Sequence, residues 1–258
     1  RSVESLRKGF PKLAEWESGA AQPTLRQLEG FGSYGFPESH AASFALLVYI
    51  SSWIKYYYPD VFVAALLNSQ PMGFYQPAQL VRDARQHGVT VRPVDVNRSG
   101  WDHSLEEVCG NYRAVRLGFR LIKGIREQDM RLLVDQRGEG YKNLQALRDT
   151  GVSLSALERL ADADAFRSLH LDRRQALWEV SARDHPKGLF KGRVESEDAT
   201  ALPEMRLSEQ VVNDYAATSL SLKAHPVSFV REQLSMLHIL AARTLNHEIP
   251  NGQLVKAA

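Results

Sequence analysis

The sequence predicts a mainly α-helical protein that carries one small β-hairpin. Apolar residues recur at helical spacing between glycines and prolines, which mark the ends of segments. Residues 101–119 instead alternate apolar and polar side chains around a turn that contains a glycine, as a hairpin requires. A length of 258 residues with 44% hydrophobic content supports a sizeable core in one or two domains.

Composition excludes several classes of protein. The single cysteine, Cys109, cannot form an internal disulfide or a cysteine-rich zinc site, which fits a reducing, cytoplasmic location. No run of residues approaches the ~20 apolar positions of a membrane span, so we expect no membrane partner. The net charge of +2 neither requires nor excludes a nucleic acid. The chain starts at Arg1 without a signal-peptide pattern, and we expect it to be part of a longer protein.

A glycine-rich loop at residues 30–37 leads into the longest predicted helix, Ser39–Tyr58. The helix contains no glycine or proline, and Pro59 ends it. Backbone N–H groups at such a helix start can bind a phosphate. An ordinary buried helix after a glycine loop is the alternative, and the residues alone favour it. The side chains that could contact an anionic ligand here are Tyr34, Ser39, His40 and Lys55.

Proline and glycine also delimit most of the remaining elements. We expect helices at 60–69 and 78–87, followed by an extended edge strand at 89–96. The predicted hairpin joins residues 101–108 to residues 113–119. The helices expected further along the chain are 127–136, 143–149, 156–161, 172–182, 208–217 and 227–237.

Residues 121–126, Leu-Ile-Lys-Gly-Ile-Arg, resemble the first hairpin of a helix-hairpin-helix element. Gly124 lets the chain turn without a Cβ, so backbone N–H groups at the next helix start can contact a DNA phosphate. Such contacts position DNA without reading its sequence, and we expect Arg120, Lys123 and Arg126 to join them. A solvated basic face on a small domain is the alternative that the residues leave open. The basic residues between positions 113 and 131 are Arg113, Arg116, Arg120, Lys123, Arg126 and Arg131.

A second hairpin is expected at residues 160–166, Leu-Ala-Asp-Ala-Asp-Ala-Phe. It lacks the glycine, but aspartate tolerates the left-handed conformation better than most residues, so the turn can survive at Asp164. The charges of Asp162 and Asp164 would repel a phosphate. Arg173 and Arg174 follow closely and are expected to compensate by binding DNA.

Two longer stretches resemble a known family. Residues 34–45, Tyr-Gly-Phe-Pro-Glu-Ser-His-Ala-Ala-Ser-Phe-Ala, and residues 57–68, Tyr-Tyr-Pro-Asp-Val-Phe-Val-Ala-Ala-Leu-Leu-Asn, are similar to the fingers domain of bacterial C-family DNA polymerases. These are the relatives of the polymerase III alpha subunit. The Pro-Glu pair at 37–38, Phe44 in place of a tyrosine, and residues 67–75 resemble the error-prone, damage-induced branch more than the replicative one.

The resemblance covers about residues 30 to 229 and implies a domain organisation. The catalytic aspartates of the family belong to the palm domain, which precedes the fingers. We therefore expect no catalytic residue and no metal site in this chain. The implied segments are a helical fingers domain at 1–98, a tandem helix-hairpin-helix domain with the small hairpin at 99–182, a linker at 183–206, a helical bridge at 207–246, and the start of a truncated OB-fold at 247–258.

The resemblance implies a DNA-directed DNA polymerase that acts in translesion synthesis with Mg²⁺ and deoxynucleotides. This chain would shape the nucleotide pocket, through Tyr34 and its neighbours, and would bind duplex primer-template. The family works with a sliding clamp and a Y-family-like accessory protein, and Leu189-Phe190 resembles the end of a clamp-docking peptide. The alternative is a non-catalytic helix-hairpin-helix module that binds DNA or a partner.

Overall fold

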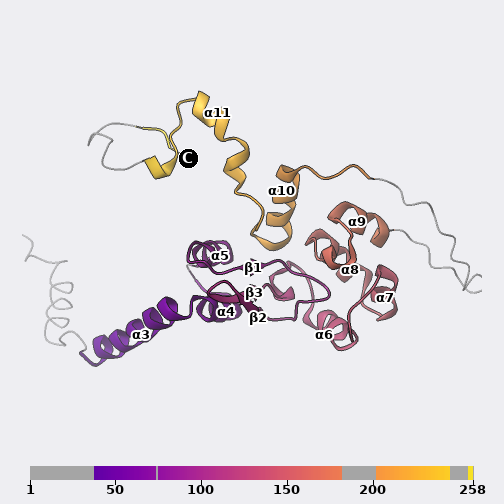
Figure 1. Ribbon diagram of the computed structural model, residues 1–258, viewed down its shortest axis with the longest axis horizontal. Coiled ribbons are helices and arrows are strands. Elements are labelled where there is room, and N and C mark those ends of the chain that lie inside the picture. The colour runs from indigo at the N-terminus through magenta and orange to yellow at the C-terminus, as the bar shows by residue number, and fades with distance from the viewer. Residues whose placement is uncertain (1–37, 74, 182–201, 245–254, 258) are drawn as a thin grey trace, which may run out of the picture. The chain divides into compact units, whose positions relative to one another are not determined.

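The computed structural model of the protein divides into two compact units between Tyr56 and Tyr57. Within the first unit the structure describes most of helix α3, and within the second it describes a small sheet and the remaining helices (Figure 1). The described residues are 38–73, 75–181, 202–244 and 255–257.

Helix α3 spans Glu38–Tyr57, so the predicted long helix is confirmed to within one residue at each end. It forms because 20 consecutive residues contain neither glycine nor proline. The rings of His40 and Phe44 lie one turn apart and pack with their centroids 4.4 Å apart. Pro59 then takes the first position of the next helix, where its missing N–H costs nothing.

The sheet of the second unit has three strands in the order β1-β3-β2. Strands β2 (Ser104–Cys109) and β3 (Tyr112–Arg116) form the predicted antiparallel hairpin, which turns through Gly110 at φ 72°. Strand β1 (Val91–Arg92) pairs in parallel with β3 and is the core of the predicted edge strand. The predicted fold class, mainly α with a small β-hairpin, is confirmed.

Two helices cover this sheet. Helix α4 (Pro59–Asn68) packs against β2 and β3, and α5 (Pro77–Gln86) packs beside β1. The side-chain amide of Asn68 both donates to the His103 carbonyl and accepts from the His103 backbone N–H, at 2.9 and 2.8 Å. These two hydrogen bonds fix the end of α4 on the start of the hairpin.

The helix-rich part that follows contains the two expected hairpins. The first lies between the short 3₁₀ helix η2 (Phe119–Leu121) and α6 (Glu127–Asp135). The second follows α8 (Leu154–Asp162), and one buried core runs from the sheet through both. Its largest fully buried side chains include Leu67, Phe119, Met130, Leu133, Leu147, Leu160 and Phe166. The remaining elements of this part are α7 (Leu144–Asp149), η3 (Arg167–Leu169) and α9 (Arg173–Ser181).

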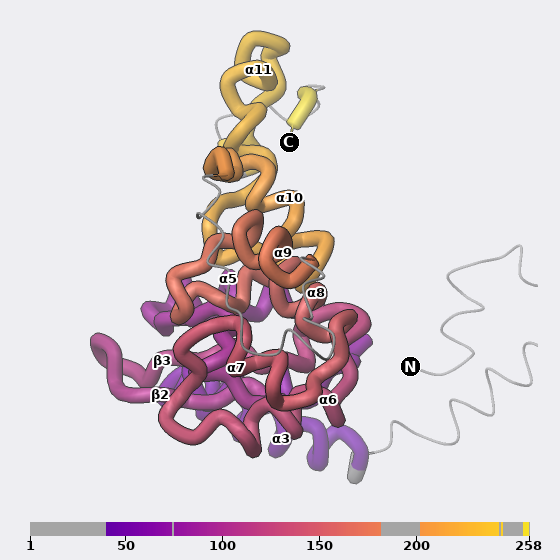
Figure 2. Tube along the Cα trace, turned by 90° about the vertical axis from the view of Figure 1, so that its right-hand side faces the viewer, coloured from indigo at the N-terminus to yellow at the C-terminus, as the bar shows by residue number. Residues whose placement is uncertain are grey.

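The C-terminal part begins with α10 (Leu207–Thr218), which packs against α8 (Figure 2). The predicted helix at 227–237 is interrupted, because η5 (Pro226–Phe229) and α11 (Arg231–Met236) are separate turns joined at Val230. The short η6 (Ala242–Thr244) follows, and Leu240 forms a parallel bridge with Ala257. In the portion of the chain that is described, no helix has the length and apolar character of a membrane span.

Candidate nucleic-acid interface

The first hairpin turns at Gly124, which is exposed and has φ +73°. Residues other than glycine rarely adopt this left-handed backbone conformation, which explains why a glycine occupies the turn. A Cβ at this position would meet nothing closer than the guanidinium of Arg159, whose Nε would lie 3.6 Å away. The space outside the turn is therefore open to an approaching ligand.

The start of α6 adds hydrogen-bond donors to this turn. Arg126 occupies the N-cap position in an extended conformation, and no side chain caps the helix. The first-turn N–H groups have no acceptor within their own helix and carry the positive end of the helix dipole. Glu127 and Asp129 in the same turn offset part of that charge, and Asp129 also accepts from the Ser153 hydroxyl at 3.0 Å. The turn and the helix start together form a site with the donors that a phosphate needs.

Three cationic side chains surround the turn. Arg126 is 70% exposed and lies 3.1 Å from Asp129, a surface ion pair that exchanges readily with an incoming anion. Arg159 on α8 is exposed and has no hydrogen-bond or ion-pair partner among the described residues. Lys123 donates its backbone N–H to Ala217 at 2.9 Å and its Nζ to the Tyr215 carbonyl at 3.1 Å. Lys123 therefore also fastens the hairpin to the end of α10.

Arg159 is the interface residue that the sequence did not indicate. Arg159 lies 35 residues after Gly124 in the sequence, and no local motif links the two. Only the packing of α8 beside the first hairpin brings its guanidinium to the turn.

Two of the basic residues near the hairpin have partners within the fold. Arg120 donates to the carbonyls of Asn68 and Gln70, at 2.8 and 3.1 Å, and to the Asp102 carboxylate at 2.7 Å. Arg116 donates to Glu106 at 2.7 Å, and its side chain is only 10% exposed. Arg120 therefore holds the end of α4 in place, and its expected contact with DNA is not part of the interface that we propose.

The second hairpin keeps its fold through Asp164, which has the left-handed φ of +59° that the sequence suggested. Its carboxylate is only 9% exposed and accepts from Arg167 Nε at 2.8 Å and from Lys223 Nζ at 3.0 Å. Both carboxylate oxygens are turned towards cations, so the charge of Asp164 is paired within the fold, and the expected repulsion of a phosphate stays a prediction. Asp164 instead ties the second hairpin to the segment after α10.

Arg173 and Arg174 also contact that C-terminal segment. Arg173 is 2% exposed, forms an ion pair with Asp214 and donates to the Gln210 carbonyl at 3.0 Å. Arg174 donates to the Pro203 carbonyl at 2.6 Å and lies 3.6 Å from Glu209. A buried, paired arginine cannot reach a phosphate without breaking its pair, so we assign Arg173 to the fold rather than to DNA binding.

The expected nucleotide-pocket residues belong to the first unit or lie outside the described residues. Tyr34 is outside them, as are Leu189 and Phe190 of the expected clamp-docking peptide. Ser39 lies in the first turn of α3. His40 packs on Phe44, and Lys55 lies in the last turn of the same helix. The described residues contain no group of three histidine, cysteine or acidic side chains that could hold a metal ion, so they do not fit a two-metal site.

The fold and this geometry first define a class of domain, the helix-hairpin-helix domain. A sequence model described as the helix-hairpin-helix motif matches residues 88–176, which include the sheet and both hairpins. More specifically, the chain is similar to curated proteins named error-prone DNA polymerase. It is 53% identical to error-prone DNA polymerase 1 of Rhizobium meliloti over 90% of this chain, and 55% identical to the Sinorhizobium medicae protein over 89%. The Caulobacter vibrioides protein is 48% identical over 89% of this chain. The chain spans 23% of the length of the first two relatives and 24% of the third.

Proposed function

We propose that this chain is a segment of an error-prone, C-family DNA polymerase, and that its first hairpin binds the backbone of duplex DNA. The observation that carries the proposal is the open turn at Gly124, followed by the uncapped start of α6 and flanked by Arg126 and Arg159. The similarity to polymerases over about nine-tenths of the chain supports the choice of DNA as the ligand.

The binding would be independent of base sequence. Phosphate oxygens would accept from the N–H groups at the start of α6, and the two guanidinium groups would add charge-assisted contacts. All of these groups would contact phosphates and none a base edge, so they would fix only the position and orientation of the DNA. Binding of this kind releases counterions and weakens steeply as the salt concentration rises.

Other roles are proposed from the family resemblance. The loop at residues 30–37 and helix α3 would belong to the fingers and shape the nucleotide pocket through Tyr34, Ser39, His40 and Lys55. The whole enzyme would work in the cytoplasm, in translesion synthesis and damage-induced mutagenesis, with Mg²⁺, deoxynucleotides, a sliding clamp and a Y-family-like accessory protein. The chain alone is not expected to extend a primer, because the palm carboxylates of the family precede the fingers. A non-catalytic DNA-binding module is the second candidate, and the names of the relatives disfavour it.

A comparison of two glycine variants tests duplex binding by the hairpin. Gly124 and Gly138 are both exposed with positive φ, +73° and +51°, so alanine strains the backbone at either position. A Cβ at Gly138 meets nothing within 4 Å, whereas one at Gly124 would lie 3.6 Å from Nε of Arg159, in the proposed phosphate site. Fluorescence anisotropy with a labelled duplex should show at least about tenfold weaker binding for Gly124→Ala, the loss of one charge-assisted hydrogen bond or more, and little change for Gly138→Ala.

The two variants also separate loss of fold from loss of the interface. Thermal melting of both proteins should show similar destabilisation, since both substitutions place a side chain at positive φ. Equal duplex affinity for the two variants would contradict the proposed role of the first hairpin.

A further inference from the structure

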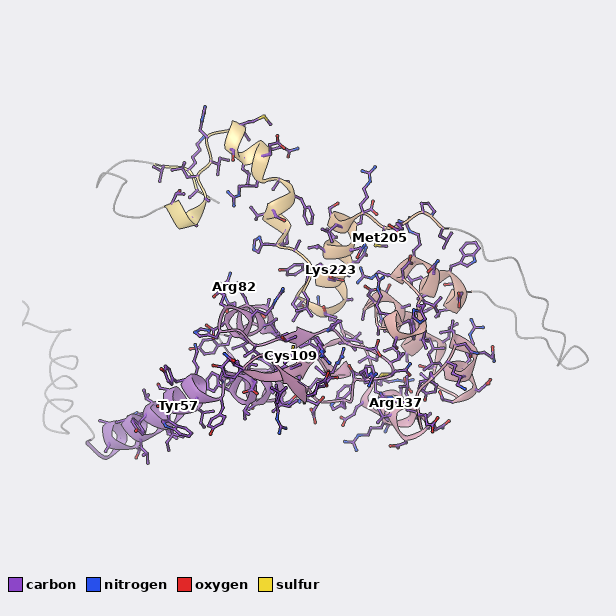
Figure 3. All side chains as sticks on the ribbon, viewed as in Figure 1. Tyr57, Arg82, Cys109, Arg137, Met205 and Lys223 are labelled. Atoms are coloured by element: carbon purple, nitrogen blue, oxygen red, sulfur yellow. The ribbon has the colours of Figure 1, made fainter. Side chains whose placement is uncertain are left out.

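A second basic feature lies away from the first hairpin. A cleft of about 640 Å³ opens between α5 and the segment that begins in α10 and continues to residue 225. Figure 3 labels Arg82 on α5 and Lys223 on the segment facing it. The side chains that give the cleft its chemical character are Arg82, Arg85, Tyr215, Ser221, Lys223 and His225.

The charge of this cleft comes mainly from two arginines of α5. None of the described residues that line it is an aspartate or a glutamate. Arg82 is exposed and has no hydrogen-bond or ion-pair partner in the described part of the chain, and Arg85 is exposed and donates only to the Leu222 carbonyl, at 3.0 Å. Lys223 contributes less, because Asp164 and Asp214 accept from its Nζ at 3.0 and 3.1 Å. An unpaired guanidinium in a concave site without a carboxylate favours an anionic ligand.

The two walls differ in a way that suits a nucleic-acid strand. Arg82 and Arg85 are three positions apart on α5 and therefore lie on one face of the helix. Tyr215 and His225 line the cleft from the other segment and supply rings on which a base can stack. A basic groove combined with aromatic side chains is the usual arrangement for binding single strands without sequence preference.

We propose that this cleft binds the phosphodiester backbone of a single nucleic-acid strand, with Arg82 and Arg85 on the phosphates. The proposal deepens the proposed function, on which it rests for the choice of a nucleic acid over another phosphate ligand. The wall that carries Tyr215 is held to both hairpins, by Lys123 at the Ala217 carbonyl and by the ion pairs of Asp164 and Asp214. The cleft is therefore preformed, and strand binding does not have to order this wall.

The test compares arginine variants of the 258-residue chain in anisotropy titrations with a labelled oligothymidylate. Arg82→Ala removes a side chain without a described partner, so it should leave the melting temperature unchanged. It should weaken strand binding at least about tenfold, the loss of one charge-assisted contact, and Arg82→Glu should weaken it further. Arg98→Ala, which removes another exposed arginine outside the cleft, should have little effect.

Two further measurements give the outcomes that overturn the proposal. Competition with a deoxynucleoside triphosphate distinguishes a free-nucleotide site from a strand site. If Arg82→Ala weakens triphosphate binding and leaves strand binding unchanged, the cleft is a nucleotide site and the proposal is wrong. Strand binding that falls in Gly124→Ala and not in Arg82→Ala places the strand at the hairpin and also overturns it. Failure of the duplex test with persistent Arg82 dependence would reject the hairpin role and leave the cleft as a strand site.

Discussion

Arginine has two separate roles in this chain, and the groups around each side chain decide which role it takes. Arg126 and Arg159 lie in solvent beside an open turn, where a guanidinium can meet a phosphate. Arg173 is buried against Asp214, and Arg120 donates to two backbone carbonyls. All four are basic residues in or near a hairpin, so residue type and spacing cannot separate them. The acceptors are supplied by distant parts of the chain.

His103 makes stability depend on pH at the scale of one residue. Its ring is buried beside the sheet, and its Nδ1 accepts from the Gly118 N–H at 3.1 Å. Burial, assisted by the charge of Arg120, lowers the pKa of His103 from 6.5 to about 4. The unfolded chain therefore binds a proton that the folded chain excludes between these values. The contribution of the neutral His103 ring to the free energy of unfolding is fully present above pH 6.5 and falls as the pH drops from 6.5 towards 4.

The free energy of unfolding should fall by about 2 kcal/mol between pH 7.5 and pH 5, because each unit of the pKa shift of His103 is worth 1.36 kcal/mol. Urea denaturation at a series of pH values measures it. The His103→Gln variant should be less stable and should lack most of this pH dependence, whereas the exposed His170→Gln should retain it. An unchanged pH profile in His103→Gln would show that another group is responsible.

At the scale of elements, prolines and glycines predicted the ends of the helices most reliably. Helix α5 starts at Pro77 and ends just before Gly88, within one residue of the prediction. The predicted helix at 156–161 instead begins at Leu154, because the Ser153 hydroxyl accepts from the Ala156 N–H and caps it. Ser155 could cap this helix equally well by local sequence. The choice between the two serines depends on tertiary contacts such as that of Ser153 with Asp129.

The second hairpin is attached to the C-terminal segment through the ion pair of Asp164 with Lys223. Asp164→Asn keeps the shape of the side chain and its tolerance of positive φ, and it removes the charge that Lys223 and Arg167 face. We expect a loss of about 1–3 kcal/mol in the free energy of unfolding, the range for weakening hydrogen bonds to charged groups. Asp162→Asn, which changes a more exposed neighbour without a described partner, should cost much less. Equal losses in urea denaturation would rule out the attachment.

At the scale of the whole molecule, the first hairpin, the second hairpin and the C-terminal segment of the second unit are linked. Lys123 donates to the end of α10, and Asp164 pairs with Lys223 beyond it. The sequence predicted the fold class, most elements and the first hairpin, because these depend on local patterns. The linkage depends on contacts between distant residues, such as that of Lys123 with Tyr215, 92 positions further along the chain, which no local pattern encodes.

The salt dependence of duplex binding measures whether the first hairpin binds the DNA backbone. Each phosphate contact contributes about 0.9 to the slope of log affinity against log salt concentration, so Arg126→Ala combined with Arg159→Ala should lower that slope by about 2. The control removes two exposed cations outside the hairpins, Arg98→Ala with Lys142→Ala, and should leave the slope nearly unchanged. An unchanged slope in the hairpin variant, or an equal reduction in the control, would contradict the account.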